Sequence, residues 1–292
     1  MLLSRRIRNV PLLDARMEDH NVYHSKFRVG VEIRRGVTRD WALWPESLRR
    51  GHESRRSSAI ISLTDGLGIR SLGRERLLRR GECLLDLRKH CWGVREEDRA
   101  ISLVVEWEPG HFGRSIDTSF ETLRISPRGL EALQRAAATI AGTRSSIELR
   151  QAVRDVFAVL RSHGVPLHLP PESAFVEAVP EHEVVLARII DRALSHRGDR
   201  VGMVDLEDLS GWSERSLRRH LRQYLRKYHF NALAWRELYR RWRLSTGLAL
   251  MGAAKATTES VAEYLGYSSP TAFCRAFASA GLPSPGSIRR LL

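Results

Sequence analysis

The chain contains one pattern twice, as GWSERSLRR over Gly211–Arg219 and as GYSSPTAFCR over Gly266–Arg275. In both copies a glycine and an aromatic residue lead to serine and then to an amphipathic helix that carries arginine. Glycine permits a tight turn because it adopts positive φ at no steric cost, and serine is favoured just before a helix begins. The two copies predict two helix-turn-helix motifs, over about residues 202–226 and 258–280, which are units that place a helix in the major groove of DNA.

The first copy has a row of arginines on one side of its second helix, because spacings of three and four residues return to the same helix face. Such a helix fits a major groove, where arginine pairs bidentately with guanine and its neighbours bind phosphates. We expect Gly211 to form the turn and Ser213 to cap the helix. The alternative, a solvated basic helix, is disfavoured by the duplication. The row consists of Arg215, Arg218, Arg219, Arg222 and Arg226, opposite Leu217, Leu221, Tyr224, Leu225 and Tyr228.

The second copy has the same build with less charge. We expect Gly266 to form its turn, Ser269 to cap its helix and Pro270 to take the first helical position, where a missing N–H costs nothing. Aromatic and aliphatic residues at helical spacing supply its core. These core positions are Val261, Leu265, Phe273 and Phe277.

The candidate contacts of the second copy follow from aligning the two caps. The alignment places Arg275 at the position of Arg219, so Arg275 is the expected base or phosphate contact, with Thr271 second. Cys274 has two interpretations, an apolar neighbour of a thymine methyl group or a packing residue. Two such helices in one chain reach adjacent major grooves, about 34 Å apart on one face of the duplex.

The overall charge agrees with a polyanionic partner. Lysine and arginine number 48 against 34 aspartate and glutamate, which gives a formal net charge of +14, and a basic protein attracts nucleic acid. A length of 292 residues allows about two domains. These numbers fit a nucleic-acid binder, although arginine-rich composition alone is weak support.

Other sequence features predict a cytoplasmic protein without a membrane segment. The three cysteines, Cys83, Cys91 and Cys274, show neither a disulfide framework nor a zinc spacing. Met1–Pro11 carry three arginines and no long apolar core, unlike a secretory signal. No apolar stretch approaches the ~20 residues that span a bilayer.

The fold class that we predict is α+β, in three parts. Residues 1–112 form a β-rich, cupin-like barrel or sandwich, with short strands separated by turns. Residues 113–179 hold two helices, at 127–141 and 146–163, followed by a proline-rich linker over Val165–Pro180 in which no helix is expected. Residues 180–292 are all helical. The expected strands are Val29–Ile33, Ala59–Leu63, Cys83–Leu87 and Ile101–Trp107, and the expected helix caps are Ser126 and the capping box Ser145–Glu148.

Residues 180–292 resemble the DNA-binding domain of the AraC/XylS family of bacterial transcription regulators. The run Glu259–Phe277 carries most of the resemblance, while Ser213–Leu221 is similar to the family's first recognition helix and Arg243–Met251 to its long joining helix. The resemblance implies promoter binding and control of transcription, commonly activation through contact with RNA polymerase. It implies base-facing roles for Arg215, Arg218, Arg219, Thr271, Cys274 and Arg275.

Departures from the family pattern occur in the last turns, at Gly281–Pro283 and Ile288, and at three places in or near the first motif. Glu207 replaces a small alanine between the helices of the first motif, which places a carboxylate near a buried seam. The turn glycine expected after the first recognition helix is missing near Leu225. Tyr228–Ala234 resembles an insertion. These departures predict an unusual orientation of the first motif, or mainly phosphate contacts by it.

The N-terminal half offers only general expectations. Family members often carry a cupin-like barrel that binds a small effector or dimerises, so both an effector and a homodimer are candidate partners. The helices at 127–141 and 146–163 either form a dimer interface or pack on the barrel. Tryptophans line an effector pocket or, as we favour, the core. They are Trp41, Trp44, Trp92 and Trp107.

We expect no metal, no cofactor and no enzymatic activity. The histidines do not group as ligands would. His20 and His24, four apart, could share a helix face, but two histidines without a third ligand are more often surface residues. Two alternatives to the regulator remain: a nonspecific nucleic-acid-binding protein that uses charge alone, and a cupin-type metal enzyme fused to a binding domain. The remaining N-terminal histidines are His52, His90 and His111.

Overall fold

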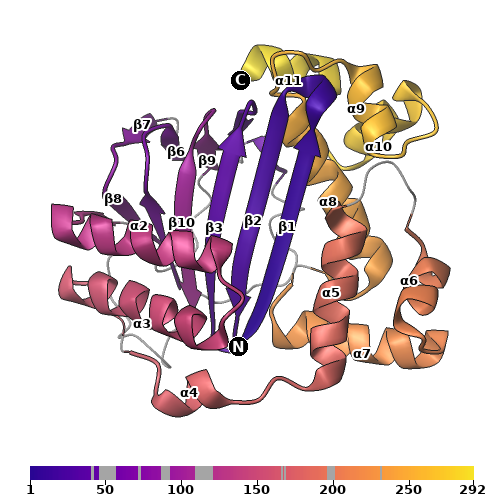
Figure 1. Ribbon diagram of the computed structural model, residues 1–292. Helices are drawn as coiled ribbons and strands as arrows, with labels where there is room; N and C mark the ends of the chain where they lie inside the picture. Colours follow the sequence, from indigo (N-terminus) through magenta and orange to yellow (C-terminus); the bar gives the residue numbers. More distant parts are fainter. Residues whose placement is uncertain are drawn as a thin grey trace.

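The computed structural model describes residues 1–40, 43–45, 57–71, 74–86, 93–108, 121–165, 167, 169–195, 201–230 and 232–292. Within these residues the N-terminal half forms two antiparallel sheets (Figure 1). The larger sheet has the order β1 (Leu2–Val10), β2 (Ala15–Tyr23), β3 (Phe27–Arg35), β10 (Ile101–Trp107), β5 (Ser57–Ser62), β8 (Glu82–Asp86) and β11 (Glu121–Arg124). The smaller has the order β4 (Arg39–Asp40), β9 (Gly93–Glu96), β6 (Leu67–Ser71) and β7 (Arg74–Leu78).

The four expected strands are all present, as β3, β5, β8 and β10, so the predicted β-rich half is confirmed. The first hairpin, β1 and β2 joined by the 3-10 turn η1 (Pro11–Leu13), was not expected. His20 lies on β2 and His24 just after it, and both are buried. The prediction that they are surface residues is wrong. The spacing of four that suggested a shared helix face also fits a strand, because the period of two that governs a strand returns residues four apart to one face.

Two helices, α2 (Pro127–Gly142) and α3 (Ser146–Ser162), cover one face of the larger sheet (Figure 1). Ser126 Oγ accepts the N–H of Gly129 at 3.2 Å, which confirms the cap. Ser145 likewise accepts the N–H of Glu148 at 3.3 Å, but the Glu148 carboxylate contacts the Thr143 hydroxyl. The expected capping box is therefore only half formed. The apolar faces of both helices share a core with β3, β5 and β10, so these faces pack on the sheet.

The proline-rich segment differs from the expectation. A short helix, α4 (Glu172–Val176), lies within it. The helix fits between Pro171 and Pro180, and Pro171 stands at the N-cap, where no backbone donor is needed. The prediction of a wholly non-helical linker is wrong for these residues.

The C-terminal region is all helical, as predicted. It contains α5 (Glu181–Ser195), α6 (Met203–Ser210), α7 (Glu214–Lys227), α8 (Trp235–Leu250), α9 (Thr258–Tyr264), α10 (Pro270–Ser279) and α11 (Pro285–Leu291). In the part of the chain that the structure describes, no helix is long and apolar enough to cross a membrane.

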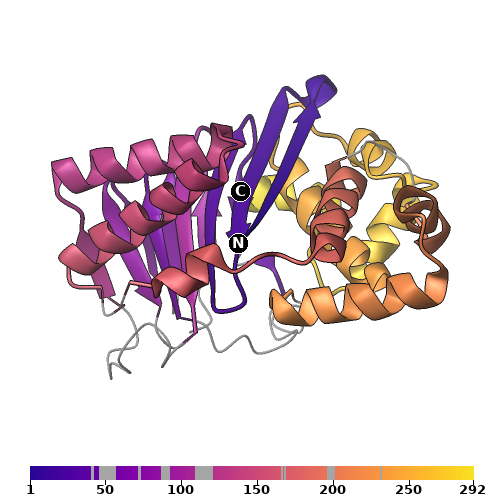
Figure 2. The same ribbon diagram turned by 60° about the horizontal axis from the view of Figure 1, so that its bottom comes forward.

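The first hairpin packs against these helices as well as extending the sheet (Figure 2). Asp191 of α5 accepts three hydrogen bonds from β1, from the Ser4 hydroxyl at 2.7 Å, the Arg5 N–H at 2.8 Å and the Arg6 Nε at 2.9 Å. The core of the C-terminal helices consequently continues into β1 and β2. Trp44 belongs to this core and Trp107 to the core of the sheet, whereas Trp41, Trp92, Cys91, His52, His90 and His111 lie outside the described residues.

Candidate nucleic-acid interface

The first helix-turn-helix motif consists of α6 and α7. Gly211 ends α6 with a φ of 69°, and its N–H donates to the Glu207 carbonyl at 2.8 Å, which confirms the turn. Ser213 stands at the N-cap of α7, but its side chain accepts no backbone N–H and lies 3.2 Å from the Ser216 hydroxyl. The position was predicted correctly and the side-chain cap was not. Glu207 is half-buried beside this turn.

The second motif, α9 and α10, has every expected turn and cap. Gly266 has a φ of 67°, and the next N–H, of Tyr267, donates to the Ala262 carbonyl at 2.9 Å. Ser269 Oγ accepts the Ala272 N–H at 3.1 Å, and Pro270 is the first residue of α10. Local sequence signals were sufficient here, because each bond joins residues close together in the chain.

The two recognition helices end alike. After α10, Gly281 has a φ of 74° and the Leu282 N–H donates to the Phe277 carbonyl at 3.0 Å. After α7, His229 has a φ of 55° and the Phe230 N–H donates to the Leu225 carbonyl at 2.9 Å. Both are Schellman caps, which need one left-handed residue. The glycine that the sequence lacks near Leu225 is thus replaced by His229.

His229 holds this conformation with the help of the N-terminal half. Its Nε2 lies 3.0 Å from the Ser25 carbonyl oxygen and 3.0 Å from Glu108 Oε1. A left-handed residue with a Cβ carries a cost of roughly 1–2 kcal/mol, which such contacts offset. The later end also makes α7 longer, with 14 residues against 10 in α10. The first recognition helix therefore presents one more turn.

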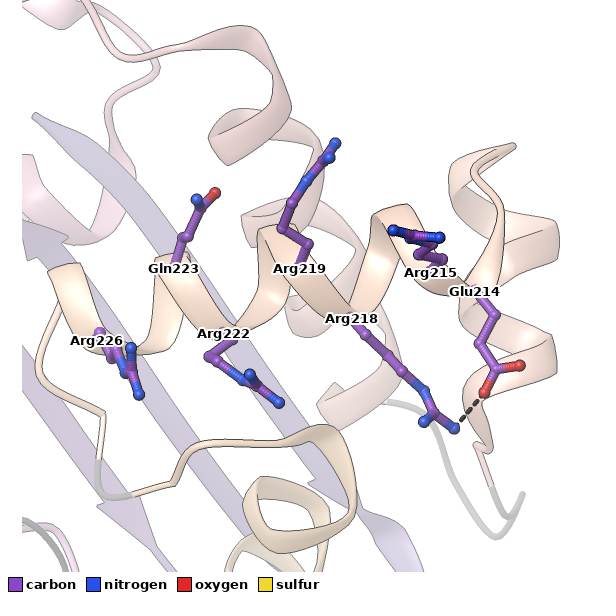
Figure 3. Close-up of a pocket in the computed structure, with 7 residues that line it drawn as sticks. All are labelled: Glu214, Arg215, Arg218, Arg219, Arg222, Gln223 and Arg226. Atoms are coloured by element: carbon purple, nitrogen blue, oxygen red, sulfur yellow. Dashed lines mark ion pairs between the residues drawn. The ribbon is translucent and has the colours of Figure 1, made fainter.

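The exposed face of α7 carries the predicted arginine row. The side chains project into solvent around an open hollow, with Arg219 and Gln223 on one side of the helix and Arg218 and Arg222 on the other (Figure 3). Among the described residues, only Arg218 of this row has an ion-pair partner, Glu214. The opposite face is buried, as predicted. The full row is Arg215, Arg218, Arg219, Arg222 and Arg226, all exposed.

The exposed face of α10 is less charged. Thr271 and Arg275 are exposed, Cys274 is half-buried, and Phe273 and Phe277 are fully buried. Because Cys274 is neither buried nor fully exposed, both interpretations of that residue remain. The two motifs are thus similar in backbone and unequal in charge.

A small aromatic cluster supports Arg219. The His220 ring centroid lies 5.1 Å from that of Trp212 and 4.7 Å from that of His182 on α5. Burial lowers the pKa of His220, and the nearby His182 and Arg219 lower it further. The His220 Nε2 lies 3.4 Å from an Arg219 nitrogen, and the lowered pKa of the imidazole disfavours a second positive charge beside the arginine.

Helix α8 joins the two motifs and belongs to both. Near its start, the Trp235 Nε1–H donates to the Val201 carbonyl at 2.7 Å, just before α6. Near its end, Gly247 packs so closely that an added Cβ would lie 3.0 Å from the Phe273 ring of α10. Stacked rings of Trp235, Tyr239 and Trp242 run between these points at centroid spacings of 5.4 Å. The helix is therefore packed against both motifs, one near each of its ends.

Sequence reasoning missed the arginines on this connector. Arg236, Arg240 and Arg243 follow a spacing of four and three residues, which is the same signal that identified the α7 row. The signal was overlooked because large aromatic residues interrupt it. In the part of the chain that is described, no group of three or more His, Cys, Asp or Glu residues could hold a metal.

Comparison with known proteins gives structural likenesses only. No protein-family model and no curated protein sequence matches the chain. Among solved structures, ToxT from Vibrio cholerae matches at 12% identity over 91% of this chain and 99% of that chain, with a TM-score of 0.38. A ToxT structure with an unsaturated fatty acid bound matches at 12% identity over 93% of this chain and 97% of that chain, with a TM-score of 0.36.

The AraC-like transcriptional activator CuxR matches at 11% identity over 72% of this chain and 74% of that chain, with a TM-score of 0.34. The solved structures that the chain resembles thus include a regulator of the AraC-like type, the family that residues 180–292 resemble in sequence. Likenesses this loose carry no inference about function.

Proposed function

We propose that this protein is a sequence-specific DNA-binding transcription regulator whose α7 and α10 enter adjacent major grooves of one duplex. The observation that carries the proposal is the pair of helix-turn-helix motifs joined by one helix, each with an exposed polar face on its second helix. A solvated basic helix explains one such face and leaves the second unexplained. The DNA-binding domain is residues 180–292.

The two motifs contribute unequally to DNA binding. The five exposed arginines of α7 supply most of the attraction to phosphates, which dominates affinity and its dependence on salt. The α10 face, with Thr271 and Arg275, has fewer charges and depends more on contacts to base edges. The first motif therefore contributes mainly affinity and the second mainly specificity, with Arg219 the principal base contact of α7.

The regulatory output is activation of transcription through contact with RNA polymerase, as the sequence resemblance of residues 180–292 implies. Residues 1–112 and 113–179 form the second part of the regulator. Its first hairpin is joined to α5 through Asp191, so the sheet and the DNA-binding helices are in direct contact.

The test uses a duplex selected by the full chain from a random pool. Arg219→Ala and Arg275→Ala should each lower the preference for the selected duplex over a scrambled one by about 1–3 kcal/mol, or about 5-fold to 150-fold. Arg161→Ala, an exposed arginine on α3, is the matched control and should have no effect. Unchanged preference in both test variants would contradict the assignment.

The same competition tests the alternative of a protein that binds nucleic acid by charge alone. A protein that binds by charge gives equal affinities for selected and scrambled duplexes at every salt concentration. For such a protein, Arg275→Ala would leave the preference between the two duplexes unchanged. A difference between the two duplexes for the wild-type chain supports sequence-specific reading.

A further inference from the structure

The connector α8 carries two exposed arginines that the motifs do not include. Arg236 and Arg240 are four residues apart and so lie on one side of the helix. Neither has an ion-pair partner among the residues that the structure describes. By contrast, Arg241 pairs with Glu237 at 3.3 Å on another side of α8. The charge of the Arg236–Arg240 side is thus uncompensated by carboxylates.

This side of α8 leads to the turn of the second motif. The Arg243 guanidinium carbon lies 3.5 Å from the ring centroid of Tyr267, in the turn that precedes α10. Burial raises the pKa of Tyr267, and the charges of Arg243 and Arg240 oppose that rise, so Arg240 lies within electrostatic reach of the same ring. The row formed by Arg236, Arg240 and Arg243 therefore has one end, at Arg243, beside the turn that precedes α10.

The other end of the row lies at the first motif. Arg236 follows Trp235, whose indole donates to the Val201 carbonyl before α6. Arg243 lies seven positions after Arg236, and at a rise of 1.5 Å per residue the two are about 10 Å apart along the helix. The row therefore extends along α8 from one motif toward the other.

A duplex that presents two adjacent major grooves to α7 and α10 presents a minor groove between them. That groove is about 6 Å wide and is bordered by the phosphates of both strands. Arg236 and Arg240 lie about 6 Å apart along the helix axis, so this exposed pair matches the groove in width and in charge. Long arginine side chains reach phosphates without entering the groove.

We propose that Arg236 and Arg240 bind the phosphodiester backbone between the two major grooves. The inference rests on the proposed function, because it assumes that both motifs contact one duplex. Contacts of this kind fix the position of the protein on the DNA and add affinity, and they read no bases. Arg243, seated on Tyr267, positions the row relative to α10.

The experiment compares the salt dependence of binding for the full chain and a double variant, Arg236→Gln with Arg240→Gln, on a duplex selected by the wild-type chain. Loss of two phosphate contacts should lower the slope of log K against log salt by about 2, at roughly 0.9 per phosphate. The preference for the selected over a scrambled duplex should not change. The matched control is Arg128→Gln with Arg161→Gln, two exposed arginines on α2 and α3, which removes the same charge elsewhere.

The outcomes are distinct. A wild-type chain that prefers the selected duplex, with an unchanged slope in the double variant, overturns the inference and leaves the proposed function standing. An equal fall in the control variant also overturns it, because the effect then belongs to net charge. A wild-type chain without any preference contradicts the proposed function itself. Thermal unfolding of both variants verifies that they fold, as is expected for exposed substitutions.

Discussion

Gly247 is the point where the connector touches the second recognition helix, and Gly247→Ala tests that contact. An added Cβ would lie 3.0 Å from the Phe273 ring, 3.1 Å from the Leu265 side chain and 3.2 Å from the Phe277 ring. These contacts are shorter than ordinary van der Waals separations, and all three neighbours are buried.

Two opposing effects determine how much Gly247→Ala changes the free energy of unfolding. Alanine is about 1 kcal/mol more favourable than glycine inside a helix, whereas overpacking a core costs typically about 1–3 kcal/mol. Because Phe273 and Phe277 are fully buried, they cannot move aside easily, and the crowding should exceed the gain. We expect a net loss of about 1 kcal/mol in the free energy of unfolding.

The assay is urea denaturation of the full chain with a matched variant. Gly286→Ala lies in α11, where an added Cβ meets nothing within 4 Å, so it should stabilise the protein by up to about 1 kcal/mol. The two glycines thus predict changes of opposite sign. A gain in stability for Gly247→Ala as large as that for Gly286→Ala would refute the close packing of α8 on α10.

Three further predictions concern the caps, the first hairpin and pH. Ser269→Ala should lower the free energy of unfolding by about 1 kcal/mol, because the Ser269 side chain caps α10. Ser213→Ala should change it by less than about 0.5 kcal/mol, because the Ser213 side chain makes no such bond. Equal losses in denaturation would show that both side chains act alike. Asp191→Ala should lower the free energy of unfolding by about 3 kcal/mol or more, because the nearly buried Arg6 then lacks its carboxylate partner. A loss below about 1 kcal/mol would mean that Asp191 does not hold the first hairpin to α5. Burial lowers the pKa of His24, so the unfolded chain takes up the proton first as the pH falls below about 6.5, and stability should decrease there. His24→Gln should reduce this decrease in denaturation series between pH 7 and pH 5, and an identical pH dependence in the variant would exclude the effect.

Local signals in the sequence were enough for the second motif. The cap at Ser269, the proline after it and the glycine turn at Gly266 each act within a few residues, so neighbouring residues specify them. The strand Ile101–Trp107 was predicted to the residue because its apolar residues alternate, as in a strand packed on one face. Features of this kind do not depend on the rest of the chain.

Distant contacts decided the features that the sequence did not reveal. The first hairpin was missed because arginines interrupt its apolar pattern, and one of them, Arg8, is buried through an ion pair with Asp19 on the neighbouring strand. The left-handed conformation of His229 is supported by Ser25 and Glu108, both far away in sequence. Such pairs become neighbours only after folding, so no local rule identifies them.

Selection of duplexes from a random pool with the full chain, followed by sequencing, tests the claim that two unequal motifs read one duplex. Two conserved elements should be enriched, with centres about 10 base pairs apart, one helical turn. Selection with Arg219→Ala should remove the preference in one element, and selection with Arg275→Ala should remove it in the other. Enrichment of a single element, or of none, would contradict the claim.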